Sequence, residues 1–433
     1  MPRIYSLLIL LVCAAARPAS AQAFQHPGML HRQADLDRMR TRVAAGSEPW
    51  LSGWRKLAAN PHASAAYSAQ PADTVYRGTG TPENYARLFN DIAAAYANAL
   101  HWHVSGEASH AQAAVRILNG WSARLTVLSG TADKFLAAGI YGYEIANAGE
   151  LMRGYAGWAA ADRDRFGTML RTVFLPMNRD FLARHNGSCI SHYYANWDLV
   201  NMASLLAIGI FLDDRKAYGE AVEYFKNGAG NGSIRNAVWF IHPGGLGQWQ
   251  ESGRDQGHSL MGPSVLGSIC EMAWNQGEDL YGFDDNRFLK GCEYVAKYNL
   301  GDSVPYVAYD NCTRVDQQVI AADGRGGLRP GWELVFNHYA RRKGLAAPNV
   351  QRYAERVRPE GGGGDYGPNS GGFDQLGFGT LTASLPPEAS LIIPARQGGR
   401  KQAIRIDALG RLFPAWELDL GEVPFPIPAP RGP

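Results

Sequence analysis

The sequence lacks the features that mark several common classes of protein. Its 42 basic and 40 acidic residues leave a formal net charge of +2 and form no basic block, so we expect no nucleic-acid partner. After the N-terminal segment, no run approaches the roughly 20 uninterrupted apolar residues that a membrane span needs. There is no Cys-x-x-Cys pair and no Gly-x-Ser-x-Gly elbow, which argues against a thiolate zinc site and a serine hydrolase of that type.

The N-terminus has the pattern of a secretory signal peptide. Arg3 precedes an apolar run from Leu7 to Ala16, and small residues at 19–21 provide a cleavage site before Gln22. We therefore expect residues 1–21 to be removed and the mature protein to be secreted or periplasmic.

Cysteine is scarce, with five residues in the chain. Cys13 lies in the signal segment, and the four that remain are Cys189, Cys270, Cys292 and Cys312. An even number of cysteines in an exported chain predicts at least one disulfide and leaves three pairings open.

Most of the chain, from about Leu36 to Gly344, predicts a succession of amphipathic helices with short, Gly-rich connections. We expect them near 84–104, 109–124, 134–153, 161–182, 194–213, 216–227, 233–241, 258–276, 286–299 and 330–343. So many helices joined by short loops must close into a ring or stack into a solenoid. Because no strict solenoid motif repeats, we predict an all-α fold, a closed or incomplete (α/α) toroid, as one catalytic domain over 22–385.

The composition changes after Pro359. Residues 361–372 are too rich in glycine for a helix, and no Lys-Ser/Thr follows them as a phosphate loop would require. We expect an active-site loop or rim here. The tail over 386–433 is expected to form a few edge strands or to pack on the domain.

The segment from Gln248 to His258 concentrates polar groups beside an apolar helix, which is costly unless they line a wet surface. We interpret Gln250 and Arg254 as substrate clamps and His258 as a proton-transfer group. The alternative for His258 is a histidine that only packs.

The acidic residues of this segment allow other interpretations. Together with His258, Glu251 and Asp255 contain metal-ligand atoms, but Gly253 and Gly257 are expected to break the helix that would align them, so we predict no metal. The two carboxylates also fit a glycoside hydrolase.

Two further groups of residues are candidates for the site. Residues 192–197 precede an apolar helix, so His192 and Asn196 are placed to meet a substrate carboxylate, while Trp197 or Tyr193 stacks on a sugar. The alternative is a capping asparagine with core aromatics. In the second group, Tyr306 and Tyr309 lie near Cys312, and either is a phenolic acid or base or packs with a satisfied hydroxyl.

Four short motifs follow one another along the chain: His26-Pro27-Gly28-Met29-Leu30, Asn196-Trp197, Glu251-x-x-Arg254-x-x-x-His258, and a Gly-rich segment from Asp365-Tyr366-Gly367 to Phe378-Gly379-Thr380-Leu381. In this order they resemble the alginate lyase superfamily of polysaccharide lyases, most closely polysaccharide lyase family 38. The resemblance implies an (α/α) toroid that cleaves an acidic polysaccharide, such as mannuronate-rich alginate or glucuronan, by β-elimination without a cofactor.

That chemistry suggests a role for each candidate. Asn196 and Arg254 would take up charge at the uronate carboxylate, and His258 and Tyr309 would serve as base and acid, with His192 and Tyr306 in reserve. The substrate-binding candidates are Tyr193, Trp197, Gln250, Glu251 and Tyr306.

The chain departs from the better-known helical alginate lyases. His258 stands where their motif has a tyrosine, and Trp197 follows Asn196 where they have a histidine, so the order of base and acid stays open. Two other functions remain: a glycoside hydrolase using Glu251 and Asp255, and a non-catalytic carbohydrate-binding protein. The oligomeric state is left open.

Overall fold

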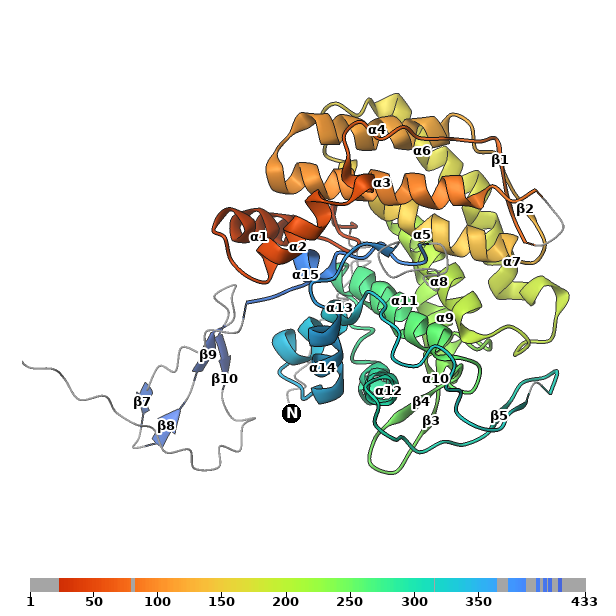
Figure 1. Ribbon diagram of the computed structural model, residues 1–433, viewed down its shortest axis with the longest axis vertical. Coiled ribbons are helices and arrows are strands. Elements are labelled where there is room, and N and C mark those ends of the chain that lie inside the picture. The colour runs from red at the N-terminus through yellow and green to blue at the C-terminus, as the bar shows by residue number, and fades with distance from the viewer. Residues whose placement is uncertain are drawn as a thin grey trace, which may run out of the picture.

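The computed structural model describes residues 23–78, 82–314, 316–363 and 373–386, and the backbone of four short strands in the tail. Helices dominate this part (Figure 1). They are α1 (Gln33–Ala44), α2 (Trp50–Ala58), α3 (Tyr85–Ser105), α4 (Ala108–Ser122), α5 (Lys134–Met152), α6 (Ala160–Met169), α7 (Leu175–Arg184), α8 (Ala195–Phe211), α9 (Arg215–Asn227), α10 (Ile234–Ala237), α11 (Gln256–Asn275), α12 (Phe283–Asn299), α13 (Trp332–Phe336), α14 (Pro348–Val357) and α15 (Gly379–Thr382).

The strands are short and form separate pairs. A parallel pair joins β1 (Thr74–Arg77) and β2 (Val127–Gly130), and antiparallel pairs join β3 (Val238–Ile241) to β4 (Gly247–Trp249) and β5 (Tyr309–Asp310) to β6 (Asp316–Gln317). In the tail, β7 (Ala395–Gln397) pairs with β8 (Arg400–Gln402), and β9 (Ile404–Ile406) with β10 (Leu412–Pro414).

An inner set of helices runs in one direction. Along α5 and α8, Gly139 faces Val200, Gly142 faces Ser204, and Gly149 lies near Phe211, so the two helices are parallel. A Cβ on Gly139 would come within 2.8 Å of the backbone nitrogen of Asn201, so glycine is what allows this close approach. Corresponding contacts make α3, α11 and α13 parallel to them, with their N-termini at one end of the body.

The outer helices run back between the inner ones. Contacts of His110 with Asn98 and of Trp121 with Asp91 set α4 antiparallel to α3, and those of Asn299 with Gln256 do the same for α12 and α11. The inner helices are buried on every side: 17 of the 19 residues of α5 and 16 of the 17 of α8 are buried. Helices that are apolar all round belong in a core. The predicted (α/α) toroid is confirmed.

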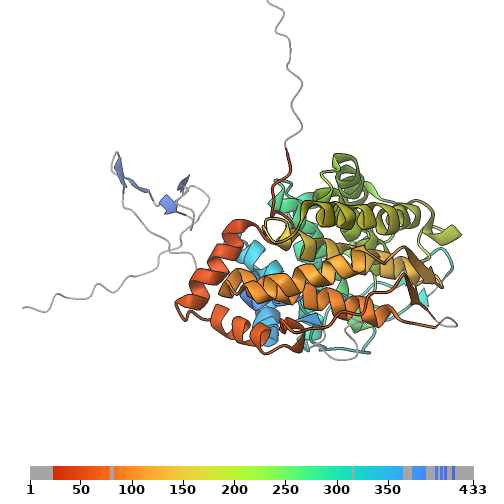
Figure 2. The ribbon, with the colours of Figure 1, turned by 90° about the horizontal axis from the view of Figure 1, so that it is seen from above.

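The two ends of the helical succession meet. The view from above shows the red N-terminal helices beside blue C-terminal ones (Figure 2). Gly53 of α2 lies against the backbone of Leu381 in α15, and Arg38 donates to the carbonyl of Thr382. These contacts bring the start of the chain against α15.

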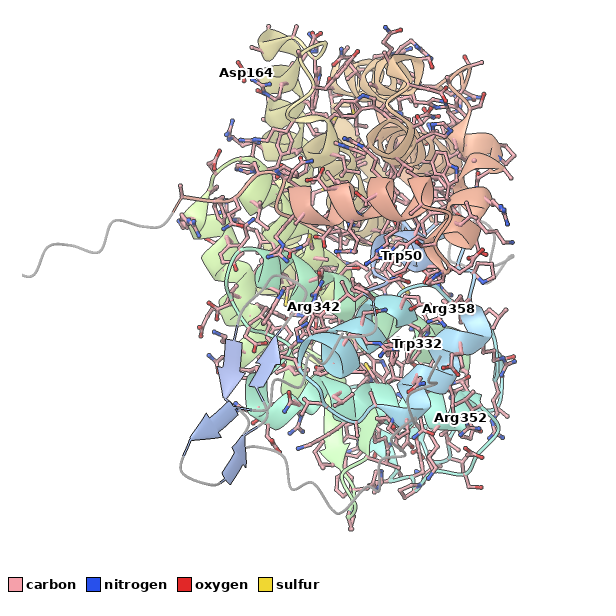
Figure 3. The ribbon with its side chains drawn as sticks, turned by 90° about the vertical axis from the view of Figure 1, so that its left-hand side faces the viewer. Trp50, Asp164, Trp332, Arg342, Arg352 and Arg358 are labelled. Carbon is pink, nitrogen blue, oxygen red and sulfur yellow. A yellow bond between two sulfur atoms is a disulfide. The ribbon has the colours of Figure 1, made fainter. Side chains whose placement is uncertain are left out.

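On the neighbouring side, ion pairs and aromatic packing attach α13 and α14 (Figure 3). Arg342 forms a bidentate pair with Glu271 of α11, with both N–O distances 2.7 Å, and Trp332 packs on Tyr353 at 4.6 Å between ring centroids.

Most predicted helices are confirmed to within a few residues, and three predictions need correction. The helix predicted over 233–241 is wrong after Ala237, because Val238–Ile241 are β-branched and aromatic residues that pair with β4. The segment 161–182 is α6 and α7 joined by a π-turn. Gly257 does not break α11 but lies in its first turn, behind the N-cap Asp255.

Other expectations have mixed outcomes. Cys189 and Cys312 form a disulfide, whereas Cys270 and Cys292 are buried free thiols. Among the described residues, no helix is long and apolar enough to cross a membrane. The signal segment 1–21, residues 364–372 of the Gly-rich stretch and the packing of the tail lie outside the described residues.

Candidate active site

The candidate site lies where the inner helices α8 and α11 begin. The amide of Ala195 donates to Gln250 Oε1 at 3.0 Å, which ties the first residue of α8 to the end of the β3–β4 hairpin. Two helix N-termini therefore meet here. Their unpaired N–H groups and positive dipole ends favour an anionic ligand.

Arg254 is the cationic group of the site, and its position is set by a buried carboxylate. Its Nη1 donates to Glu251 Oε1 at 2.8 Å and to Asn196 Oδ1 at 3.3 Å. The other oxygen of Glu251 accepts the backbone N–H of Asn196 at 3.2 Å. The guanidinium also lies 4.1 Å from the ring centroid of Tyr194, and the side chain keeps 24% exposure. It is thus held in place and still open to solvent.

His258 is oriented by the residue that caps its helix. Asp255 accepts the backbone N–H of His258 with one oxygen and Nδ1–H with the other, both at 2.7 Å. Burial pushes the pKa of Asp255 upward, but the hydrogen bonds from His258 and the charge of Arg254 bring it below its ordinary value. Since Nδ1 donates to this carboxylate, Nε2 carries the lone pair, and no described residue hydrogen-bonds to it.

Tyr309 reaches the site from the β5–β6 hairpin. Its hydroxyl donates to Asn231 Oδ1 at 2.8 Å and interacts with the Gln250 amide. Burial raises the pKa of Tyr309, and the neighbouring Tyr194 and Glu251 act in the same direction. The hydroxyl is therefore held as a phenol.

Of the ten predicted residues, five come together: Asn196, Gln250, Glu251, Arg254 and Tyr309, with His258 joined to them through Asp255. Gln250 and Glu251 are buried and make their contacts within the protein. Their role in this structure is to position Asn196 and Arg254, so direct binding of substrate by either stays a prediction.

The other predicted residues lie behind or beside this cluster. Tyr193 is buried against Phe181 and Phe135, and the half-buried Trp197 packs on Tyr193 at 4.5 Å. Tyr306 donates its hydroxyl to the carbonyl of Gln317 at 2.6 Å.

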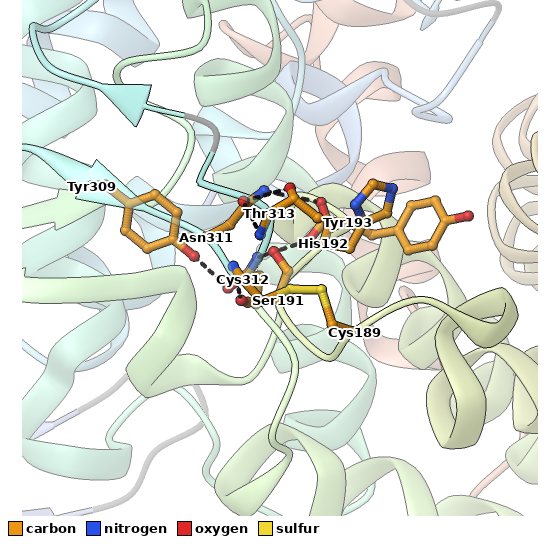
Figure 4. Close-up of a disulfide and its surroundings, with 9 residues drawn as sticks. Cys189, Ser191, His192, Tyr193, Tyr309, Asn311, Cys312 and Thr313 are labelled. Atoms are coloured by element: carbon orange, nitrogen blue, oxygen red, sulfur yellow. Dashed lines mark hydrogen bonds between the residues drawn. A yellow bond between two sulfur atoms is a disulfide. The ribbon is translucent and has the colours of Figure 1, made fainter.

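His192 packs edge-on against Tyr193 next to the disulfide (Figure 4). The roles predicted for His192, Tyr193, Trp197 and Tyr306 remain predictions, and the structure gives Tyr193 and Tyr306 evident packing roles.

Sequence reasoning missed two residues. Tyr194 presents its ring to Arg254, and Asn231 binds Tyr309 from a loop 78 residues away. Tyr194 precedes α8 directly, so its place at a helix start could have singled it out. No signal in the sequence marked Asn231. Within the described part of the chain, no three His, Cys, Asp or Glu side chains are grouped to hold a metal.

Comparison with known proteins gives one family. Residues 54–305, more than half of the chain, match the model of the alginate lyase family. Alginate lyase A1-III from Sphingomonas species A1 superposes with a TM-score of 0.57 at 16% identity, covering 86% of this chain and 100% of that one.

Other solved structures agree on the fold. A histidine-to-alanine variant of A1-III complexed with a tetrasaccharide has a TM-score of 0.57 at 15% identity, covering 86% of this chain and 99% of its own. An alginate lyase from Bacteroides ovatus has a TM-score of 0.53 at 12% identity, covering 81% of this chain and 100% of its own. A search of curated proteins finds no matching relative.

Proposed function

The chain belongs to the alginate lyase family and is a polysaccharide lyase, and from this premise we propose that it cleaves β-1,4-linked polyuronates, either glucuronan or mannuronate-rich alginate, by β-elimination at the cluster of Asn196, Arg254, His258 and Tyr309. The observation that carries the proposal is the open Arg254 guanidinium beside Asn196 at two helix N-termini. Membership of a lyase family argues against both the glycoside hydrolase and the non-catalytic binding protein.

Binding and charge neutralisation fall to Arg254 and Asn196. The C5 proton of a uronate is hard to remove while C6 is a full carboxylate, so a cation and hydrogen-bond donors must take up the charge that develops on the carboxylate. Arg254 keeps only part of its charge for this purpose, because Glu251 is already paired with it. The helix N-termini and the Asn196 amide supplement it.

The proton transfers fall to His258 and Tyr309. His258 Nε2 takes the C5 proton, the C4–O4 bond breaks as the C4–C5 double bond forms, and the Tyr309 hydroxyl gives its proton to O4. Asp255 stabilises the imidazolium that results. A proton passing from His258 to the Tyr309 phenolate through solvent returns both groups to their starting state.

Export is part of the proposal. The signal-like segment 1–21 and the Cys189–Cys312 disulfide both fit a secreted or periplasmic enzyme, because disulfides persist in oxidising compartments. A polymeric acidic substrate is also encountered outside the cytoplasm.

The test measures ultraviolet absorbance while the purified protein acts on glucuronan, polymannuronate, polyguluronate and a neutral glucan separately. Elimination creates a conjugated double bond, so absorbance should rise with glucuronan or polymannuronate. His258→Ala and Tyr309→Phe should each slow this rise about 100-fold or more.

Tyr306→Phe provides the matched control, because it removes a hydroxyl from the same segment that is already bonded to Gln317. It should stay within a few-fold of the wild type. Full activity of both His258→Ala and Tyr309→Phe would refute the assignment of base and acid. A rise with polyguluronate alone would refute the substrate.

A further inference from the structure

Asn231 is buried in a loop between α9 and α10, and its whole side chain is engaged. It is 4% exposed. Its Nδ2 donates to the carbonyls of Ser191 at 3.0 Å and Tyr193 at 2.7 Å, while its Oδ1 accepts the hydroxyl of Tyr309 at 2.8 Å. The residue thus connects the segment before α8 with the β5–β6 hairpin.

These contacts determine the orientation of the amide. Turning it over would place Oδ1 against two carbonyl oxygens and leave no donor for them, which is costly in a buried site. Oδ1 therefore always faces Tyr309, and it can only accept. A phenol satisfies this arrangement, whereas a phenolate would oppose a lone pair to a negative charge.

We propose that Asn231 is a positioning residue that holds Tyr309 as a phenol and so assigns it the role of the acid that protonates O4, leaving proton abstraction to His258. This inference rests on the proposed function. Gln250 complements it from the other side. Its Oε1 is engaged by Ala195, so its amide nitrogen faces Tyr309 and supports the phenolate that exists briefly after transfer.

The surroundings of Asn231 keep the arrangement in register. The amide of Cys312 donates to Ser191 Oγ at 2.9 Å, next to the Cys189–Cys312 disulfide, and Gln248 hydrogen-bonds both the N–H and the carbonyl of Val307 (Figure 4). The backbone on both sides of Tyr309 is therefore tied down. Asn231 acts on the one part that remains, the hydroxyl.

The test is a double-mutant cycle between Asn231→Ala and Tyr309→Phe, with kcat and KM measured on the polyuronate that the wild type cleaves. If Asn231 acts through Tyr309, Asn231→Ala lowers kcat about 10- to 100-fold and changes KM less than about 3-fold. In the Tyr309→Phe background it adds nothing further. In the Tyr306→Phe background it keeps its full effect. Multiplicative losses in the cycle would overturn the inference.

The pH profile separates positioning from simple structural support. The alkaline limb of kcat/KM should move to lower pH in Asn231→Ala, because the phenolate is no longer disfavoured. Asn231→Asp keeps an acceptor facing the hydroxyl, so its limb should stay in place or move to higher pH. This variant also serves if Asn231→Ala does not fold, and a limb that moves to lower pH in Asn231→Asp would overturn the inference.

Failure of the proposed function would look different. If Tyr309→Phe keeps wild-type activity, Tyr309 is not the acid, and the assignment made under the proposed function falls together with the inference. If Tyr309→Phe is impaired but Asn231→Ala and Asn231→Asp match the wild type in kcat and pH profile, only the inference falls.

Discussion

Two segments bring side chains to the same site, and they are held in different ways. In residues 250–258 the contacts that orient Arg254 and His258 come from Glu251 and Asp255, each three residues before its partner. The hairpin that bears Tyr309 has no such local support. Its partners are Asn231, Gln248 and Cys189, which are 59 to 123 residues distant along the chain.

The difference shows which kind of site can be recognised in a sequence. The first segment has the composition of its own site, because a cap, a cation and a histidine stand at helical spacing. The second segment contains two tyrosines of equal promise. Only the distant partners decide that Tyr309 faces the site and that Tyr306 bonds Gln317.

Removal of the disulfide should break the second segment alone and have the largest effect on stability. Replacing Cys189 and Cys312 together by serine frees a loop of 123 residues, which should lower the free energy of unfolding by about 2–4 kcal/mol. The rate should fall as well, because Tyr309 loses its anchor. Denaturant unfolding and kcat measure the two effects. The wild type under reducing conditions is the control, and an unchanged kcat would show that Asn231 and Gln248 suffice.

Gly253→Ala should disturb the place where the two segments touch. A Cβ there would lie 2.2 Å from the hydroxyl of Tyr306 and 2.6 Å from Cβ of Gln317, so the hairpin must move away, at a cost of about 1–3 kcal/mol. We expect a lower kcat and a lower melting temperature.

Gly257→Ala is the matched control, since its Cβ would meet only Asp255 Oδ1, at 3.2 Å, within the first segment. It should change stability by less than about 1 kcal/mol. Equal effects of the two substitutions would contradict the view that Gly253 is the contact between segments.

Asp255→Asn should affect the first segment and have the smallest effect on stability. Asparagine caps a helix as well as aspartate, so only the charge is lost, and the change at neutral pH should be below about 1 kcal/mol. The pKa of Asp255 is lowered in the folded protein, so its stabilisation is present above the unfolded value of about 3.9 and disappears as pH falls through the folded value.

Unfolding experiments on wild type and Asp255→Asn across the acid range would check this sign. The difference between the two proteins should vanish at low pH. A difference that persists there would mean that Asp255 stabilises the protein through something other than its charge.

Much of the fold was predictable, and the site was predictable in part. Apolar periodicity located most helices, including α3, α5, α8 and α11, because each buries its stripe over many residues. It failed at 238–241, where the same apolar residues suit a strand, and only pairing with β4 settles the choice. Helix α14 was missed although it carries a buried face, because the expected succession ended at the preceding residues.

The sequence by itself determined that the protein is built from helices that must close on one another, and that residues 248–258 carry a charged, polar site. These properties depend on neighbours along the chain: helical spacing, capping and the cost of burying unpaired polar groups. The tertiary structure alone decided that Tyr194 rather than Tyr193 faces Arg254, that Cys189 pairs with Cys312, and that Asn231 meets Tyr309. Such choices depend on which distant backbone segments pack together, and residue spacing does not encode that directly.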